Sequence, residues 1–504
     1  MTVRSGARRK FDNITENREK QQDDMYDVLI IGCGVTGAAA AYSLARYDLK
    51  VGIVERFNDV ACGATKANSA IMHAGYDPHP GTKMALLNRR GIKAAKKICK
   101  KLDVEYRPLQ SLVLAFSEKD MEAVRDLYAR GKKNGADVRI LDRKGVLAAE
   151  PAASPDCVGA LHSRDSAIIN PWEFALAMAE VAVINGADLL LEHKVTAIRR
   201  GRGKLTVVTD RGELETRFVV NAAGAFAEDI SAMVGDTSVK SLPRAGQYYV
   251  LDKEEGKKVN SVIFRCPDEN GFKGVLVAPT VHGNLLVGPD AEPRADADDL
   301  STDRESLDKI MKSGLSSVPS VNFRNIIREY TGVRPTTSES DFVIGVSRSC
   351  RRMINLAGIC SPGLSSAPAI GDEAVRLLEK QGLVLKRRRG FIDERPPVVR
   401  LAELGDEEKR RVIEENPLYG NIICRCETVS EGEIVDALRR PIVPRSIDAI
   451  KRRCRAGMGR CQGGFCSPRV HEIISRELGV PMEDVMLDKQ GSFIITGRTG
   501  AEEN

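Results

Sequence analysis

Residues 27–55 read DVLIIGCGVTGAAAAYSLARYDLKVGIVE, and this stretch decides the fold of the chain. The short apolar run at 28–31 predicts a buried parallel strand, which leads into three glycines spaced GxGxxG. The alanine-rich segment at 38–44 is typical of a helix, and a second apolar strand ends at Glu55. A strand, a glycine turn, a helix, a strand and an acid about 20 residues past the glycines form the order of a dinucleotide-binding unit.

Each of these residues has a predicted physical role. Gly32 allows the tight turn, Gly34 lets the backbone approach a pyrophosphate at the helix N-terminus, and Gly37 lets the helix pack on the strand. Glu55 is expected to accept hydrogen bonds from ribose hydroxyls. The alternative is a structural glycine turn, and the unit alone does not distinguish NAD from FAD.

Length and charge limit the remaining possibilities. A chain of 504 residues predicts two or three domains, and a net charge of +6 does not indicate nucleic-acid binding. Residues 28–45 carry no charge, but their glycines and strand-to-helix pattern argue against a membrane span. Residues 1–24 lack the apolar centre of a secretory signal, so a disordered N-terminal extension and a cytoplasmic protein are expected.

Further segments predict the elements around this unit. A strand at 218–221 ends in the small-residue turn Asn221-Ala-Ala-Gly224, a second place where backbone can approach a cofactor. Helices are expected at 83–102, 118–134, 143–149, 170–182 and 303–316, and strands at 113–116, 189–198 and 204–209. Residues 242–290 look antiparallel, with strands at 248–251, 262–265, 274–278 and 285–287.

Cysteines crowd near the end of the chain, where five of the 12 lie within residues 424–466. A terminal cluster in a cytoplasmic chain points to metal rather than to disulfides. Cys424-x-Cys426 and Cys461-x4-Cys466 offer four thiolates, a ligand set that iron–sulfur clusters use. Structural zinc is the alternative, although its sites more often use spacers of two to four residues. Cys454 lies outside the pattern and is expected to pack.

Taken together, the motifs resemble the D-amino-acid-oxidase-like flavoprotein superfamily, in which the dinucleotide is FAD. Within it the chain is most similar to glycerol-3-phosphate dehydrogenases of the anaerobic type, with L-2-hydroxyglutarate oxidases and dehydrogenases close behind. The cysteine segment resembles the bacterioferritin-associated-ferredoxin type of [2Fe–2S] domain. The motifs that carry the resemblance to the flavoproteins are the glycine fingerprint with Glu55, Asn68-Ser69 through His73-Ala-Gly75, Ile169-Asn-Pro-Trp172, Asn221 to Gly224, Gly288-Pro289, Gly332-Val-Arg334-Pro335, and Asn355 through Gly363-Leu364.

The resemblance implies an α/β fold with three functional parts. We expect a Rossmann-type FAD-binding domain with an inserted antiparallel-sheet substrate domain, followed by a small helical iron–sulfur domain. The FAD-binding parts are expected at about 25–95, 155–240 and 330–380, and the substrate parts at about 96–154 and 241–329. A linker at 381–419, the [2Fe–2S] domain at 420–485 and a tail at 486–504 complete the chain.

The expected site residues fall into three groups. His73 is the candidate base or flavin contact, Arg334 the candidate anion binder, and Tyr248 a candidate cavity residue; the alternatives are a packed histidine and a structural salt bridge. The expected metal ligands are Cys424, Cys426, Cys461 and Cys466. The expected FAD contacts are Gly32, Gly34, Gly37, Glu55, Thr65, Asn68, Ser69, Val195, Ala223, Gly224, Gly358, Gly363 and Leu364.

The predicted function is oxidation of a small anionic secondary alcohol, with electrons leaving FAD through the cluster to a partner. sn-Glycerol 3-phosphate is the first candidate substrate and L-2-hydroxyglutarate the second. The alternative from another class is an electron-transfer subunit whose substrate site lies in a partner. The resemblance further implies a second flavoprotein, a small iron–sulfur or cysteine-bearing subunit, and in some relatives peripheral association with the inner face of the membrane.

Overall fold

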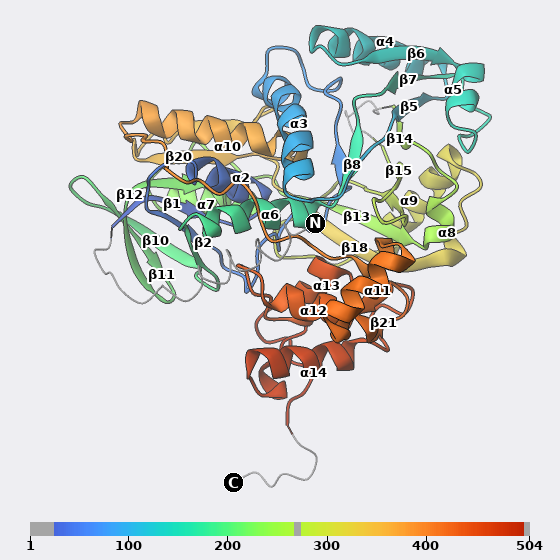
Figure 1. The fold of residues 1–504 in the computed structure, drawn as a ribbon. Helices are drawn as coiled ribbons and strands as arrows, with labels where there is room; N and C mark the ends of the chain where they lie inside the picture. Colours follow the sequence, from blue (N-terminus) through green and yellow to red (C-terminus); the bar gives the residue numbers. More distant parts are fainter. Residues whose placement is uncertain (1–24, 267–273, 498–504) are drawn as a thin grey trace.

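The computed structural model describes residues 25–266 and 274–497; the predicted disordered extension at 1–24 and the last residues of the predicted tail lie outside them. Figure 1 shows an α/β region on the left around β1 (Tyr26–Ile31), and a second sheet region on the right around β13 (Arg244–Leu251). A helical region with α14 (Ser467–Leu478) lies below both. The chain therefore has three regions, as the sequence predicts.

The first sheet has the strand order of a dinucleotide-binding fold. β1 pairs in parallel with β2 (Val51–Val54) on one side and with β12 (Gly212–Asn221) on the other. Beyond these, β9 (Asp188–Leu190) is parallel to β2, and β20 (Met353–Ala357) is parallel to β12. The antiparallel members of this sheet are β10 (Val195–Arg200), β11 (Leu205–Thr209) and β19 (Val343–Val346). The α/β prediction is confirmed.

The strand predicted at 189–198 was wrong in its continuity. It is two strands, β9 and β10, which lie at opposite ends of the first sheet. Between them Glu192 adopts a left-handed φ of 57°, and the amides of Glu192 and His193 donate to the carbonyls of Phe57 and Glu55. The chain therefore turns at Glu192 and crosses the carboxyl end of β2 instead of continuing along one strand.

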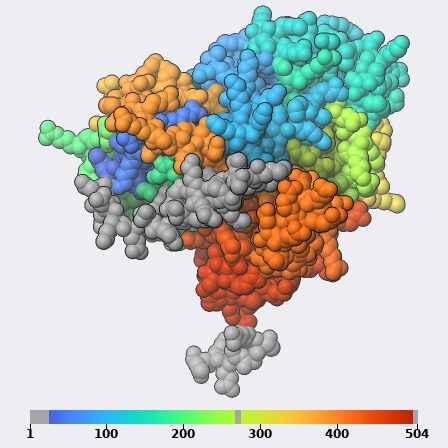
Figure 2. Space-filling view, in the orientation of Figure 1, coloured from blue at the N-terminus to red at the C-terminus, as the bar shows by residue number. Residues whose placement is uncertain are grey.

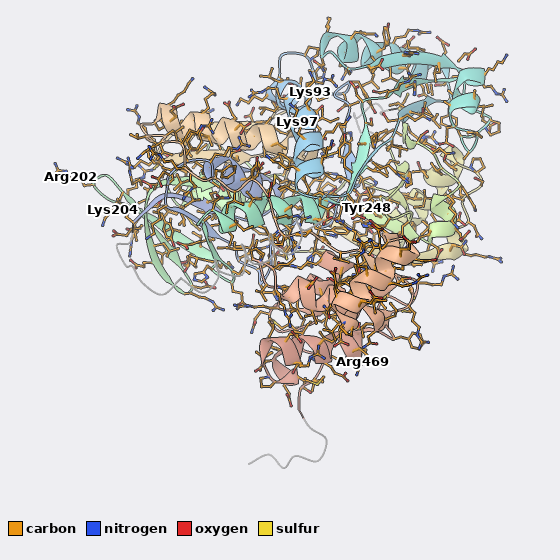
Figure 3. The ribbon with its side chains drawn as sticks, in the orientation of Figure 1. Lys93, Lys97, Arg202, Lys204, Tyr248 and Arg469 are labelled. Carbon is orange, nitrogen blue, oxygen red and sulfur yellow. The ribbon has the colours of Figure 1, made fainter. Side chains whose placement is uncertain are left out.

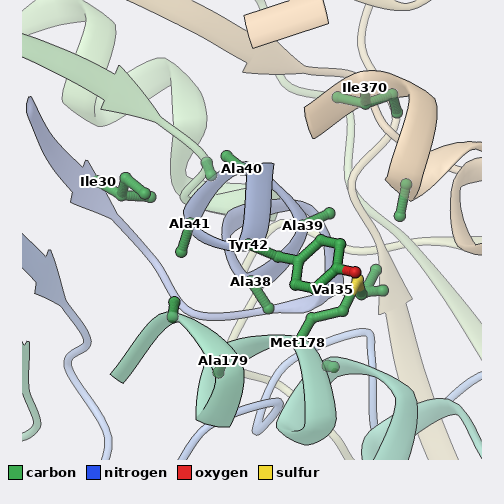
Figure 4. Close-up of a cluster of buried hydrophobic side chains, with 14 of the residues drawn as sticks. Ile30, Val35, Ala38, Ala39, Ala40, Ala41, Tyr42, Met178, Ala179 and Ile370 are labelled. Carbon is green, nitrogen blue, oxygen red and sulfur yellow. The ribbon is translucent and has the colours of Figure 1, made fainter. Parts of the chain in front are cut away.

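The helices beside this sheet pack closely because their contact faces are made of alanine and glycine. In Figure 4, α2 (Val35–Leu44) lies between Ile30 of β1, Met178 and Ala179 of α6 (Pro171–Ile184), and Ile370 of α10 (Gly363–Lys380). A Cβ on Gly37 would lie 1.9 Å from the carbonyl oxygen of Gly32, and a Cβ on Gly371 would lie 2.4 Å from that of Ala39. Although α2 and α6 are buried nearly all round, no helix among the described residues is long and apolar enough to cross a membrane.

The second sheet has nine strands and is mostly antiparallel, as predicted for the substrate region. β13 pairs with β18 (Ile326–Arg334) along its whole length, with Arg244 opposite Arg334 and Tyr248 opposite Tyr330. The other strands are β5 (Ser111–Ala115), β6 (Val138–Asp142), β7 (Gly159–Ser163), β14 (Val262–Arg265), β15 (Leu276–Pro279), β16 (Leu285–Gly288) and β17 (Glu292–Pro293).

One strand of this sheet lies outside the predicted substrate parts, and another crosses their boundary. β7 pairs with β5 and β6, although residues 155–240 were assigned to FAD binding. β18 belongs here too, although it runs past the predicted boundary near 330. Both strands join this sheet because sheet membership depends on pairing with strands far away in sequence.

Helices and two smaller sheets complete the regions described so far. β3 (Ile71–Met72), β8 (Ala167–Ile169) and β4 (Tyr106–Pro108) form a three-stranded sheet. The helices predicted near 83, 118, 143 and 303 are all present, as α3 (Lys83–Lys101), α4 (Glu118–Lys133), α5 (Arg143–Ala149) and α9 (Arg304–Ser317), together with the short α7 (Ala227–Ala232) and α8 (Lys253–Gly256).

The C-terminal region has three helices with defined caps or ends. α12 (Glu431–Leu438) has the capping box of Ser430 and Glu433, α13 (Ile447–Cys454) is capped by Ser446, and α14 ends at left-handed Gly479. β21 (Ile422–Cys424) and β22 (Val429–Ser430) form a short hairpin before them. In Figure 2 this orange-to-red region lies directly against the rest of the molecule.

The segments on either side of this region are more ordered than the sequence suggested. The predicted linker contains α11 (Asp406–Glu415), and Arg395 within it is buried. At the start of the predicted tail, Met486 bridges to Ser446 and to Phe493. Both segments therefore make tertiary contacts with the rest of the structure.

Candidate functional site

A cavity of about 880 Å³ is lined by residues of both large sheets. Its volume lies within the range of about 300–1,000 Å³ that is usual for small-molecule and cofactor sites. The glycine turn after β1 and the acid after β2 line one part of it, and the ends of β13 and β18 line another. The cavity thus extends from the first sheet to the second.

At the first sheet, glycines leave room that side chains would fill. Gly32 has a left-handed φ of 97°, and a Cβ there would lie 2.6 Å from the carbonyl oxygen of Ala222. A Cβ on Gly34 would lie 3.2 Å from the Thr65 hydroxyl, which accepts a hydrogen bond of 2.9 Å from the Val35 amide. Thr65 therefore braces the start of α2, where the helix N-terminus borders the cavity.

Glu55 is fixed by backbone amides at the edge of the cavity. Its two carboxylate oxygens accept hydrogen bonds from the amide of Cys33 at 2.8 Å and of Phe57 at 3.1 Å. Burial raises the pKa of Glu55 above its usual value, while these two amides act in the opposite direction. A carboxylate oxygen can accept more than one hydrogen bond, so Glu55 keeps acceptor capacity for hydroxyl groups in the cavity.

Most of the predicted cofactor residues line this cavity. Two do not: Gly37 lies at the contact of α2 with the Gly32 turn, and Gly358 takes a left-handed φ of 66° in the turn after β20. Asn68 lines the cavity, but its side chain bonds to its own loop through the carbonyls of Ala64 and Thr65 and the amide of Ala70. The predicted cofactor residues that line the cavity are Gly32, Gly34, Glu55, Thr65, Asn68, Ser69, Val195, Ala223, Gly224, Gly363 and Leu364.

His73 lies on the cavity wall after β3, close to the N-terminus of α10. Its Nε2 is 3.0 Å from the Ser361 hydroxyl, and its backbone amide donates to the Ser365 hydroxyl at 2.8 Å. Its ring tilts against Phe264, with 5.8 Å between the ring centroids. The two serines, which the sequence did not single out, hold the imidazole at the edge of the cavity.

Arg334 and Tyr248 meet on the second sheet, and both line the cavity. Arg334 donates to the carbonyls of Ala245 and Asp290, both at 2.8 Å, which uses two of its five N–H groups. The Tyr248 hydroxyl is hydrogen-bonded to Ser69 and Arg334, and its ring stacks on Tyr330 with 4.8 Å between centroids. Burial raises the pKa of Tyr248, although Arg334 opposes this, so the phenol stays protonated at neutral pH.

A second arginine borders the same part of the cavity and was missed from the sequence. Arg244 lies directly opposite Arg334 in the β13–β18 ladder, and both line the cavity. Directly opposed residues of an antiparallel pair point to the same face of the sheet. Only the register of the two strands, which sets Arg244 against a residue 90 positions later, reveals this site, and no local sequence pattern shows it.

In the C-terminal region, the four predicted ligands form two pairs of thiols. The sulfur atoms of Cys426 and Cys461 are 3.8 Å apart, and Cys424 is hydrogen-bonded to Cys466. The bond with Cys466, helped by the amides of Gly457 and Glu427, lowers the pKa of Cys424 to about 6. Burial alone would raise the pKa of Cys461, but the backbone amides of Phe465, Gly463 and Gly464 and the thiol of Cys426 lower it. Cys454 instead donates to the Ile450 carbonyl within α13, as expected of a packed cysteine.

Comparison with known families identifies both parts of the chain. Residues 27–377 match the family described as FAD dependent oxidoreductase, and residues 422–476 match the BFD-like [2Fe-2S] binding domain. The chain belongs to the FAD-dependent oxidoreductase family. It therefore binds FAD in its larger part and carries a [2Fe–2S] domain at its end.

Similar proteins cover both parts of this chain. A glycerol 3-phosphate dehydrogenase of Caloramator mitchellensis is 44% identical over 95% of this chain and 100% of its own length. The anaerobic glycerol-3-phosphate dehydrogenase of Escherichia coli K12 has a subunit that is 26% identical over 89% of this chain and 88% of its own. The solved structure of the FAD-bound L-alpha-glycerophosphate oxidase of Mycoplasma pneumoniae has a TM-score of 0.70 and 31% identity, covering 74% of this chain and 98% of that one.

The residues present fit both cofactors of this FAD-dependent oxidoreductase. The glycine cradle, the helix N-terminus and Glu55 suit the pyrophosphate and ribose of FAD, and the cavity is large enough to hold it. The two cysteine pairs suit a cluster with two irons, each held by two thiolates. The match of residues 422–476 to the BFD-like [2Fe-2S] binding domain favours the iron–sulfur cluster over structural zinc.

Buried ion pairs join the [2Fe–2S] domain to the FAD-binding region. Arg452 and Arg453 of α13 both bind Asp59 at 2.9 Å, and all three side chains are buried. Asp59 belongs to the loop that continues through Cys62 to Lys66, and these last two residues line the cavity. Lys66 in turn pairs with Asp488 at 3.2 Å. The C-terminal region therefore fixes the loop that borders the FAD site through these ion pairs.

A second buried network lies farther from the FAD cavity. Glu180 of α6 binds Arg440 through two bonds of 2.7 Å and Arg395 at 3.3 Å, and all three side chains are buried. Glu173, which lies earlier in α6, binds Arg395 at 2.8 Å and Arg400 at 2.9 Å. The segment predicted as a linker thus ties the [2Fe–2S] domain to the core helix of the FAD-binding region.

Proposed function

We propose that this chain oxidises sn-glycerol 3-phosphate to dihydroxyacetone phosphate and sends the electrons through its [2Fe–2S] domain to a partner. The observation that carries the proposal is the likeness to the Caloramator dehydrogenase, which extends over 95% of this chain and so includes both the cavity and the cysteine domain. The electron exit favours a dehydrogenase over an oxidase, because direct reaction with oxygen would not need the cluster.

The arginine pair on the cavity wall supports an anionic substrate. Arg244 and Arg334 are directly opposed on one face of the sheet, and like charges in that position repel each other. An anion between them relieves this repulsion, and a guanidinium binds phosphate or carboxylate through paired hydrogen bonds. A phosphate dianion would balance the two charges.

The other wall supplies the group that handles the substrate proton. His73 borders the cavity with Nε2 beside the Ser361 hydroxyl, and a neutral imidazole there can accept the proton of the alcohol as it is oxidised. FAD, when bound, supplies an acceptor for two electrons that can release them one at a time. Arg334 and Arg244 would hold the phosphate. Tyr248 would form part of the cavity wall beside Arg334. His73 would take the proton.

The proposal extends to assembly and location. The Escherichia coli relative is described as a subunit, and we infer that this chain also works with further subunits, a second flavoprotein and a small iron–sulfur or cysteine-bearing protein. We infer a cytoplasmic location, with peripheral attachment to the inner face of the membrane through such partners.

Anaerobic titration tests the substrate directly. Addition of sn-glycerol 3-phosphate to the holoenzyme should bleach the flavin absorbance, whereas glycerol, which lacks the phosphate, should leave it unchanged. Bleaching by L-2-hydroxyglutarate in place of sn-glycerol 3-phosphate would overturn the choice of substrate. Absence of bleaching with either compound would favour an electron-transfer subunit whose substrate site lies in a partner.

A further inference from the structure

The four cysteines of the [2Fe–2S] domain are not equally accessible. Cys424 and Cys466 are only 1% and 2% exposed and belong to the hydrophobic core of the domain. Cys426 is exposed and Cys461 is half-buried, and their sulfurs lie 3.8 Å apart. A cluster held by these residues therefore has one edge toward the core and one edge at the surface, and the surface edge is the one formed by Cys426 and Cys461.

The loops around the surface edge carry exposed positive charge. In residues 421–428 and 455–469 the exposed charged residues are Arg425, Arg460 and Arg469. The acid in these loops, Glu427, is only 4% exposed and is paired with Lys253 and Arg455. Arg425 directly precedes Cys426, and Arg460 directly precedes Cys461, so each arginine has its Cα about 3.8 Å from that of an outer ligand.

An exposed aromatic side chain lies in the same loop. Phe465 is 87% exposed and sits between Cys461 and the buried Cys466. Single exposed apolar residues are ordinary on a protein surface. This one shares a short loop with two cluster ligands and has arginines beside it, a combination of aromatic and arginine residues that is enriched where proteins meet.

The contacts to the FAD-binding and substrate regions leave Phe465 and Arg425 uncovered. These contacts use Gln462, which is 3.3 Å from Arg328, and Glu427 with its two cationic partners. Arg460 does bind Asp252 at 3.1 Å, but its side chain remains 69% exposed. Within the described part of the chain, the surface edge therefore stays open to a further protein after the domain has docked.

We propose that Arg425, Arg460 and Phe465 form the docking surface for a small acidic one-electron carrier protein, which takes electrons from the outer edge of the cluster. Charge complementarity selects an acidic partner, with carboxylates around an apolar patch that covers Phe465. Oxidation of one alcohol releases two electrons and two protons, so two carrier molecules are reduced in succession for each substrate consumed. The inference rests on the proposed function insofar as it takes the cluster to be the electron exit.

Binding to carriers of opposite charge tests the surface without any catalysis. The oxidised, cluster-loaded holoenzyme is immobilised, and interferometry measures the affinity of plastocyanin, an acidic copper protein, and of cytochrome c, a basic haem protein. Plastocyanin should bind more tightly, and its affinity should fall as salt rises. The double substitution Arg425→Glu and Arg460→Glu should weaken plastocyanin binding by about tenfold or more at low salt. Phe465→Ala should weaken it at both low and high salt.

The matched control is Arg202→Glu. Arg202 is an exposed arginine between β10 and β11, and Figure 3 shows it at the left edge of the molecule, well away from Arg469 of α14 at the bottom. Plastocyanin affinity should not change in this variant. An equal loss in Arg202→Glu, no loss in the double variant, or tighter binding of cytochrome c than of plastocyanin would each overturn the proposal. Electron paramagnetic resonance of every variant confirms that the cluster is intact, so a loss of binding is not a loss of the cluster.

Chemical reduction separates this proposal from the proposed function. The cluster is reduced with dithionite in the absence of substrate, and the rate of plastocyanin reduction is followed in the wild-type and double-variant proteins. One outcome is that the double variant reduces plastocyanin more slowly than the wild type although sn-glycerol 3-phosphate does not reduce the flavin. That result would contradict the proposed substrate and support the docking surface. If the double variant instead loses binding to phosphatidylglycerol vesicles while plastocyanin binding is unchanged, the surface faces a membrane and the proposal is wrong.

Discussion

The guanidinium of Arg334 lies directly over the backbone of Gly246. A Cβ on Gly246 would come within 2.6 Å of Nη2 of Arg334 and 2.8 Å of its Cζ. The atoms in the way belong to the end of a flexible side chain, so Gly246→Ala should fold normally and displace the guanidinium instead. We expect the KM for sn-glycerol 3-phosphate to rise by about tenfold, through the loss of roughly one charge-assisted hydrogen bond of ~1.5 kcal/mol, while FAD content stays the same.

Gly345→Ala is the control for this substitution. A Cβ on Gly345, in β19 of the first sheet, would meet nothing within 4 Å. Steady-state kinetics of this variant should match those of the wild type. If Gly246→Ala also leaves KM unchanged, Arg334 does not bind the substrate anion.

His73 allows a test of the proposed proton acceptor. His73→Asn keeps a polar side chain near the Ser361 hydroxyl but removes the basic imidazole. General-base catalysis contributes about 10²–10⁴-fold to a rate, so kcat should fall by that order while KM is little changed. Stopped-flow measurement of flavin reduction isolates this step from the later electron transfer. A rate of flavin reduction close to that of the wild type would identify His73 as a packing residue.

Several of the predicted residues that line the cavity belong to short local motifs. Gly32, Gly34 and Glu55 could be placed at the cavity because their roles depend on one strand–turn–helix unit. Arg244 could not, because it faces the cavity only through its pairing opposite Arg334. Gly358 shows the reverse case, since a left-handed turn requires glycine there without bringing it to the cavity.

Helix α13 and the loop at residues 58–66 form a coupled pair of elements. Burial alone would raise the pKa of Asp59, but Arg453 and Arg452 outweigh it and hold this pKa well below its usual 3.8. Asp59→Asn would leave two buried guanidinium groups without their carboxylate, which typically costs about 3–5 kcal/mol. Calorimetry at pH 7 should therefore show a lower Tm, and the variant should retain less FAD because the loop borders the cavity.

The pH dependence of this loss follows from the sign of the shift. Because the pKa of Asp59 is lower in the folded state, its contribution is fully present above the unfolded value of 3.8 and disappears as the pH falls through the folded value. The difference in stability between wild type and Asp59→Asn should hold from pH 7 to pH 5 and shrink below about pH 4. Glu305→Gln, which removes an exposed i,i+4 pair with Lys309, should change stability by less than about 0.5 kcal/mol at any of these pH values.

Elements were predictable where periodicity and caps agree. The capping box of Ser430 and Glu433 and the serine cap of α13 could be read directly from the sequence. The strand predicted at 189–198 failed because its turn at Glu192 contains neither glycine nor proline and depends on amide bonds to residues 55 and 57. The pairing of β7 with β5 could not be predicted either, because strand pairing depends on residues that are distant in sequence.

For the whole molecule, the two redox sites lie apart, so a substitution at the cluster should stop electron transfer without stopping flavin reduction by the substrate. Cys426→Ser should remove the [2Fe–2S] cluster while sn-glycerol 3-phosphate still bleaches the flavin, because the FAD cavity contains none of the four ligands. Transfer to a one-electron carrier should stop. Cys454→Ser should behave as the wild type, since this thiol bonds within α13. Visible and electron paramagnetic spectra measure both cofactors, and loss of the cluster in Cys454→Ser would contradict the assignment of the ligands.

The three-region plan was predictable from the sequence, but the attachment of the regions was not. The charge-rich segment before the cysteine domain reads as a linker, yet Arg395 within it is buried against Glu173 and Glu180. A buried arginine looks the same in sequence as an exposed one. Arg395 is buried because it binds two acidic residues that lie more than 200 positions earlier in the chain, and only the tertiary structure brings them together.

The buried ion pairs of Glu180 with Arg440 and of Asp59 with Arg453 also affect how the protein responds to heat. The penalty for taking charges out of water falls as temperature rises, so such pairs become relatively more favourable on warming. The attachment of the cysteine domain should therefore hold until the core itself melts. A thermal scan should show one cooperative transition, without an earlier step in which the cysteine domain detaches.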